Sequence, residues 1–118
     1  MQSMTYGQLP TARDFKRHLR TARDEMGAML VSPEEPAYWM ELVGDDAEVF
    51  EHAAGSLPGV TTEPIVTRHG FEKLRVQIKD VDTLYVVLAS LVHHYEDGND
   101  AAGDLASGMM STLGYEWI

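Results

Sequence analysis

A strict alternation of apolar and polar side chains along residues 73–79, within the extended run 71–79, constrains the fold more than any other feature of this sequence. Leu74, Val76 and Ile78 alternate with the polar side chains of Lys73, Arg75, Gln77 and Lys79. A strand places successive side chains on opposite faces. The segment is therefore predicted to be a strand with one buried face and one face in water, as in an antiparallel sheet.

A second extended run, residues 63–68, precedes this strand and is separated from Phe71 by His69 and Gly70. A two-residue loop that ends in glycine is typical of a tight turn between antiparallel strands. The two runs are therefore predicted to form a β-hairpin.

Apolar side chains at helical spacing and potential capping residues define the other expected elements. Asp45 and Asp82 are predicted to cap two of the helices, and Asn99 or Asp100 is predicted to cap the last one. The expected helices span residues 11–30, 45–57, 82–95 and 100–113, and the expected strands span 37–43 and 115–118.

This order of elements predicts the α+β class. From residue 37 onward it follows the ferredoxin-like βαββαβ arrangement of an antiparallel sheet, with an added N-terminal helix and an extra C-terminal helix. With 118 residues the chain is expected to be a single domain. Proline and serine at Ser32, Pro33 and Pro36 divide it into an N-terminal helical arm, 1–32, and an α+β core, 37–118.

Composition excludes several kinds of chemistry. The chain has no cysteine, which rules out disulfides, thiolate zinc sites and cysteine nucleophiles. We predict no metal site, no cofactor and no catalytic residue. Residues 1–10 are polar, and the longest apolar stretch, 84–92, is about half of a membrane span. The expected location is therefore cytoplasmic, without a membrane partner.

The formal net charge of −10 is unevenly distributed. Five basic and three acidic side chains in residues 1–30 leave a charge of +2, and four basic and sixteen acidic side chains in residues 31–118 leave −12. Residues 24–67 contain no lysine or arginine. The basic N-terminal helix has two open interpretations: an arm that binds an acidic partner, or a solvated face that offsets the acidic body.

Six carboxylates in the acidic stretch form the predicted partner-binding residues: Glu34, Glu35, Asp45, Asp46, Glu48 and Glu51. Spaced carboxylates can imitate a phosphate backbone and occupy a basic groove on another protein. The sequence therefore favours a non-enzymatic protein that acts by protein–protein binding. Small acidic antirestriction and anti-CRISPR inhibitors work in this way as a class, although no motif places the chain in one of their families.

Direct nucleic-acid binding is not predicted. The open face of the expected sheet would carry cationic side chains beside Trp39, Glu41 and Val43, and residues 69–76 resemble the RNA-recognition motif. The glycine and the first aromatic position match, but Lys73 and Val76 stand where that family has further aromatic residues, which stack on bases. The negative charge also opposes binding to phosphate.

Two other classes of function stay open. Residues 57–60 leading into 63–66 resemble the helix-to-strand passage of amino-acid-binding regulatory domains of the ACT and Lrp type, which implies a small-ligand-binding domain. The other class is a small dimeric ferredoxin-like enzyme with histidine and aspartate in an interface pocket, for which His69, His93 and His94 are the histidines to test. The helix at 84–92 is apolar nearly all round and needs cover on two sides. A second copy of the chain would supply this cover, which favours a homodimer, and the alternative is cover within one chain by the helix at 102–113 or the N-terminal helix.

Overall fold

The computed structural model describes residues 2–4, 9–26 and 38–117. It is a mixed α+β structure with a three-stranded antiparallel sheet and four helices in these residues, so the predicted α+β class is confirmed. The elements are β1 (Gln2–Met4), α1 (Ala12–Met26), β2 (Tyr38–Leu42), α2 (Gly44–Ala54), β3 (Val60–Val66), β4 (Glu72–Ile78), α3 (Val81–Glu96), α4 (Asp100–Thr112) and β5 (Tyr115–Trp117). The end of the predicted first helix and the Ser32–Pro36 break lie outside the described residues.

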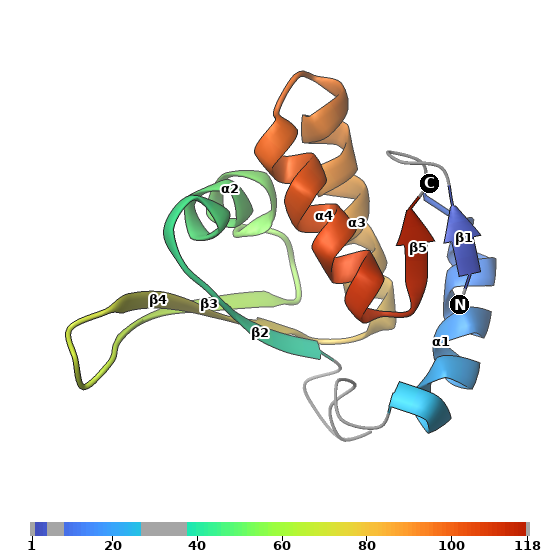
Figure 1. The fold of residues 1–118 in the computed structure, drawn as a ribbon, viewed down its shortest axis with the longest axis horizontal. Helices are drawn as coiled ribbons and strands as arrows, with labels where there is room; N and C mark the ends of the chain where they lie inside the picture. The colour runs from blue at the N-terminus through green and yellow to red at the C-terminus, as the bar shows by residue number, and fades with distance from the viewer. Residues whose placement is uncertain (1, 5–8, 27–37, 118) are drawn as a thin grey trace.

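Strand β4 lies between β2 and β3 and is antiparallel to both. Its alternation is confirmed, because Leu74, Val76 and Ile78 are buried. Tyr38 and Leu42 of β2 are also buried and pair in register with Ile78 and Leu74. Helices α2 and α3 contact β4, and Figure 1 shows α2 over one side of the sheet. The helices therefore cover one face, and no helix of the described residues covers the other.

The hairpin turn has three loop residues rather than the predicted two. Thr67 donates its backbone N–H to the carbonyl of Phe71 over 2.8 Å, and Gly70 donates to the carbonyl of Thr67 over 2.9 Å. Gly70 has a φ of 84°, in the left-handed region that favours glycine. This is the three-residue loop in which a left-handed glycine follows a tight turn. The predicted two-residue loop was wrong because Arg68 also belongs to the turn.

The last predicted strand forms, but it pairs with a strand that the sequence analysis did not predict. β5 lies parallel to β1, with Gln2 opposite Tyr115 and Met4 opposite Trp117. Leu113 and Gly114 alone separate α4 from β5, and Gly114 has a φ of 93°. This short link keeps β5 beside α4, away from the three-stranded sheet (Figure 1).

Two of the predicted helix caps, Asp45 and Asp82, were each wrong by two residues. The N-cap of α3 is Asp80 rather than Asp82, and the side chain of Asp80 accepts a hydrogen bond from the N–H of Thr83. Helix α2 begins at Gly44 with Val43 as its N-cap, and no side chain caps it. The predicted cap Asn99 is confirmed, because its side chain accepts a hydrogen bond from Ala102.

The core extends from the sheet through α3 to α1. Leu84, Leu88 and Leu91 of α3 are fully buried, and α3 contacts α1, α2, α4 and β4. Phe15 and Leu19 of α1 are buried in the same core cluster. Helix α3 is therefore covered on more than one side by its own chain, which removes the argument from which the homodimer was first predicted. None of the described helices is both long and apolar enough to span a membrane.

Candidate protein-binding surface

Four of the predicted partner-binding residues lie together on α2. Asp45, Asp46, Glu48 and Glu51 are all exposed, and we call them the acidic face of α2. Phe50 on the same helix is fully buried, so it fixes this helix against the core and leaves the carboxylates in solvent. Glu34 and Glu35 lie outside the described residues.

Local electrostatics explains why α2 tolerates this charge. Asp45 and Asp46 occupy its first turn, where the partial positive charge of the helix N-terminus stabilises anions. Within the described part of the chain, none of the four carboxylates of the acidic face forms an ion pair or a side-chain hydrogen bond. The acidic face is therefore available to cations of another molecule.

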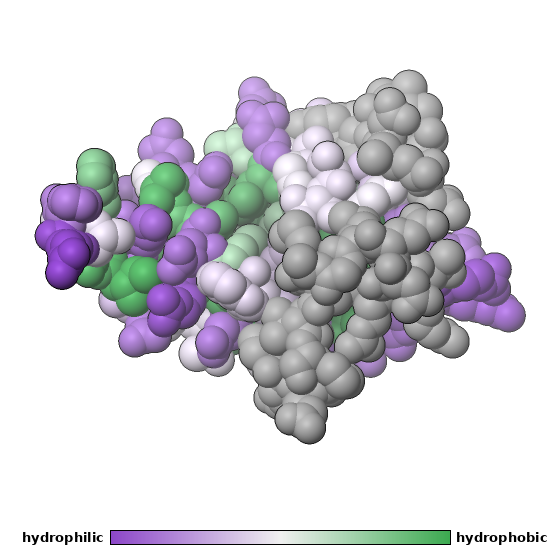
Figure 2. All heavy atoms as spheres, turned by 60° about the horizontal axis from the view of Figure 1, so that its bottom comes forward, coloured by the Kyte–Doolittle hydropathy of each residue, from purple (hydrophilic) through white to green (hydrophobic). Residues whose placement is uncertain are grey.

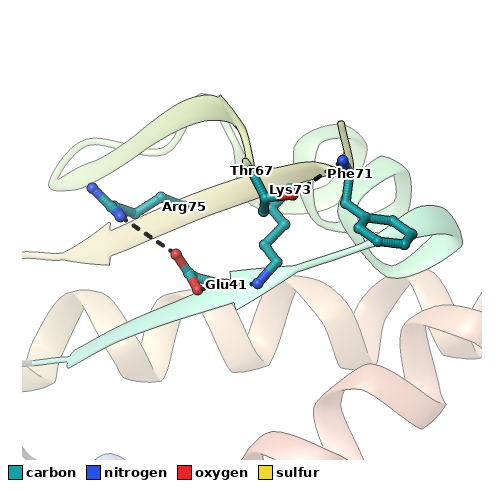
Figure 3. Close-up of polar contacts among 5 residues, drawn as sticks. All are labelled: Glu41, Thr67, Phe71, Lys73 and Arg75. Carbon is teal, nitrogen blue, oxygen red and sulfur yellow. Dashed lines mark hydrogen bonds and ion pairs between the residues drawn. The ribbon is translucent and has the colours of Figure 1, made fainter. Parts of the chain in front are cut away.

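The uncovered face of the sheet carries a different arrangement of charge. Glu41 on β2 lies between two cations of β4: its Oε1 is 3.7 Å from Lys73 Nζ and its Oε2 is 3.4 Å from Arg75 Nη2 (Figure 3). Glu63 on β3 stands opposite Arg75 in the register, on its other side. The cations that resembled an RNA-binding sheet thus have carboxylates beside them.

Large apolar side chains are exposed around this cluster. Trp39 is 48% exposed, Val43 is 55% exposed and Phe71 is 67% exposed. Figure 2 shows apolar side chains among polar ones on this side of the molecule. We call Trp39, Val43, Phe71 and the charged Glu41, Glu63, Lys73 and Arg75 the open sheet face. The sequence predicted most of this set but missed Phe71 and Glu63. Phe71 lies two residues before Lys73 and so points to the same side of the sheet, and Glu63 lies opposite Arg75 on the neighbouring strand.

The histidines do not assemble into one site. His69 lies in the hairpin turn, which is far from the C-terminal end of α3 where His93 and His94 lie (Figure 1). His94 contacts His52 of α2, with 5.3 Å between ring centroids, whereas Asp97 pairs with His93 over 3.5 Å. No three potential metal ligands come together within residues 2–4, 9–26 and 38–117.

Comparison with known proteins adds no identification. The chain matched none of the family models, curated proteins or solved structures with which it was compared. The surfaces themselves are therefore the basis for a functional proposal.

Proposed function

We propose that this chain is a non-enzymatic domain that binds a protein with a basic surface through the acidic face of α2. The observation that carries the proposal is that four exposed carboxylates share one helix and have no cationic partner in the described residues. A partner with a basic surface would supply the missing counter-charge. The complementary charges would raise the rate of association and the affinity of the complex.

The charge density of the acidic face supports the imitation of nucleic acid. Asp45 and Glu51 are six residues apart, so the four charges lie along about 9 Å of helix at roughly 1.5 Å per residue. One strand of DNA carries a charge about every 3.4 Å. The four charges are thus on average about 3 Å apart along the helix axis, which is comparable with the spacing of charges along one DNA strand. A groove that binds phosphates therefore offers suitable cations. We propose that the partner is a nucleic-acid-binding protein whose groove is blocked.

For the fold, we propose that β2, α2, β3 and β4 are the split βαβ part of a ferredoxin-like domain. The order β2-β4-β3 supports this, since it places β4, the second strand of the hairpin, between β2 and β3, which α2 connects. β5 does not take the fourth position beside β2, and this leaves the arrangement short of one strand in the described residues.

A pair of matched variants tests the binding proposal. E48K combined with E51K changes the net charge by +4 within the acidic face, and E72K combined with E96K makes the same change at other exposed positions. Tagged wild-type protein and both variants are used to capture partners from nuclease-treated lysate of the source organism. We expect the wild type and the E72K/E96K variant to retain the same partners and the E48K/E51K variant to lose them.

A competition experiment completes this test. Excess duplex DNA should release the captured proteins, because it competes for the same basic groove. Equal capture by both charge variants would contradict a role for the acidic face. Capture that duplex DNA leaves unchanged would contradict the imitation of nucleic acid.

A further inference from the structure

The open sheet face is a described surface that the proposed function does not use. It combines three exposed apolar side chains, Trp39, Val43 and Phe71, with two cations and two carboxylates. Exposed apolar side chains bordered by charged ones on one face of a sheet are a feature of protein contact surfaces. We propose that this face binds a second copy of the same chain and forms a two-fold symmetric dimer. The inference is independent of the function proposed for α2.

Net charge identifies a second copy as the occupant. The chain as a whole carries −10, so two copies repel each other over most of their surfaces. On the open sheet face Lys73 and Arg75 balance Glu41 and Glu63, and Lys79 at the end of the same row of side chains adds one positive charge. This face therefore lacks the negative charge of the rest of the chain, and two copies can meet here without repulsion between acidic surfaces. Nucleic acid would require a larger excess of cations than this single charge.

Register shows that the face is complementary to itself. Glu41 stands opposite Arg75, and Trp39 stands opposite Gln77, on the neighbouring strands β2 and β4. A two-fold axis parallel to these strands, above the gap between them, places β2 of one copy over β4 of the other. Each Glu41 then meets Arg75 of the other copy, and each Trp39 meets Gln77. Such reciprocal contacts are what a two-fold interface requires.

The existing ion pairs fit this exchange. Glu41 retains a side-chain exposure of 29% and Arg75 retains 42%, so both groups remain accessible from the open side. Separations of 3.4 and 3.7 Å to its two cations leave Glu41 able to share a further contact across an interface. Packed sheets lie about 10 Å apart, a gap that the side chains of Trp39 and Arg75 are long enough to fill.

Reciprocal charge variants test the proposal and distinguish it from a failure to fold. Sedimentation equilibrium of the full chain over a wide concentration range should show a monomer–dimer equilibrium. E41R alone should be monomeric because it leaves the cluster with excess cations, and R75E alone should be monomeric because it leaves excess carboxylates. An equal mixture of E41R and R75E chains should dimerise, since residue 41 of each copy then faces an opposite charge at residue 75 of the other.

Further variants locate the interface. W39S should raise the dissociation constant by about tenfold or more, as is typical for an interface aromatic residue. The E48K/E51K variant of α2 should dimerise like the wild type, so the two proposals can fail separately. A wild-type chain that stays monomeric would overturn the inference, as would a mixture of E41R and R75E that does not dimerise. Binding of a fluorescent single-stranded oligonucleotide that W39S abolishes would also overturn it, in favour of nucleic acid.

Discussion

Asp80 joins the sheet to α3 through one carboxylate oxygen. Its Oδ1 accepts the backbone N–H and the hydroxyl of Thr83, both over 2.7 Å. These two hydrogen bonds favour the charged carboxylate and lower the pKa of Asp80 below its ordinary value of 3.8. The first turn of α3 therefore depends on a carboxylate that stays charged until the solution is more acidic than pH 3.8.

Substitution of Asp80 should reduce stability in a manner that depends on pH. We expect D80A to lower the free energy of unfolding by about 1 kcal/mol at neutral pH, as loss of an N-cap does. D80N is the matched control, because asparagine also caps helices but carries no charge. Because folding lowers the pKa of Asp80, its charge stabilises the protein above pH 3.8 and this contribution is lost as the pH falls through the folded pKa.

Urea unfolding at a series of pH values checks this prediction. The stability advantage of the wild type over D80N should shrink as the solution is made more acidic than pH 3.8. A constant difference between wild type and D80N across this range would show that the charge of Asp80 does not stabilise the fold.

At the scale of elements, the turns set the distances between the sheet and the helices. Gly59 precedes β3 with a φ of 85°, and a Cβ atom there would lie 2.7 Å from the hydroxyl oxygen of Thr83. Thr83 cannot move away freely, because that hydroxyl donates to Asp80. Gly70 in the hairpin turn has nearly the same φ, 84°, but open space around it. A side chain at Gly70 would therefore meet backbone strain alone, whereas a side chain at Gly59 would meet the same strain and also a close contact with Thr83.

Alanine at these two glycines should have unequal effects. G70A should cost about 1 kcal/mol, which is the usual cost of a left-handed conformation for a residue with a side chain. G59A should cost at least about 1 kcal/mol more, because its methyl group also overpacks against Thr83. The measurement is chemical unfolding of both variants under the same conditions. Equal losses would indicate that Thr83 moves aside without cost.

Local pattern predicted the elements whose periodicity is strong. The alternation ending at Ile78 identified β4, and the helical stripe through Phe15 and Leu19 identified α1. Pairing between β1 and β5 escaped prediction, because three-residue strands have no measurable period and the partners lie at opposite ends of the chain. The cap of α3 was misplaced because Asp80 and Asp82 are equivalent as local signals, and packing decides between them.

The candidate surfaces were predictable to different degrees. Exposure of Asp45, Asp46, Glu48 and Glu51 follows from their charge and from the apolar stripe of their helix, and the structure places all four in solvent. The position of Glu41 between two cations depends on the register of β2 against β4, which the sequence of either strand does not contain. Surface clusters built across strands therefore require the fold.

At the scale of the whole molecule, the two proposed surfaces lie on different sides of the sheet. Helix α2 packs on the covered face (Figure 1), and the other face carries Trp39 and Arg75. A dimer formed through the open sheet face would leave both acidic faces of α2 in solvent. It would then present two copies of the acidic face to a partner, and bivalent contact raises the effective affinity without any new interaction.

The contacts of α1 with the rest of the molecule bear on whether this helix is a separate arm or unfolds cooperatively with the other elements. Phe15 is fully buried, and its ring lies 5.4 Å from that of Tyr85 on α3 and 6.2 Å from that of Tyr115 on β5. His18 contacts the carbonyl oxygen of Leu113 over 2.8 Å through its Nε2. These contacts connect α1 to the elements that follow the sheet in the chain, so α1 should unfold together with them.

Truncation of Phe15 tests this cooperativity. F15A should lower the free energy of unfolding by about 3–5 kcal/mol, the usual cost of replacing a buried phenylalanine by alanine. R13A changes an exposed residue of the same helix and should alter stability by less than about 0.5 kcal/mol. Hydrogen exchange at the amides of β4 provides the decisive measurement, because the sheet lies away from Phe15. If α1 belongs to one cooperative unit, F15A lowers protection in β4 as much as in α3; protection that falls only in α1 would show that residues 12–26 form a separate arm.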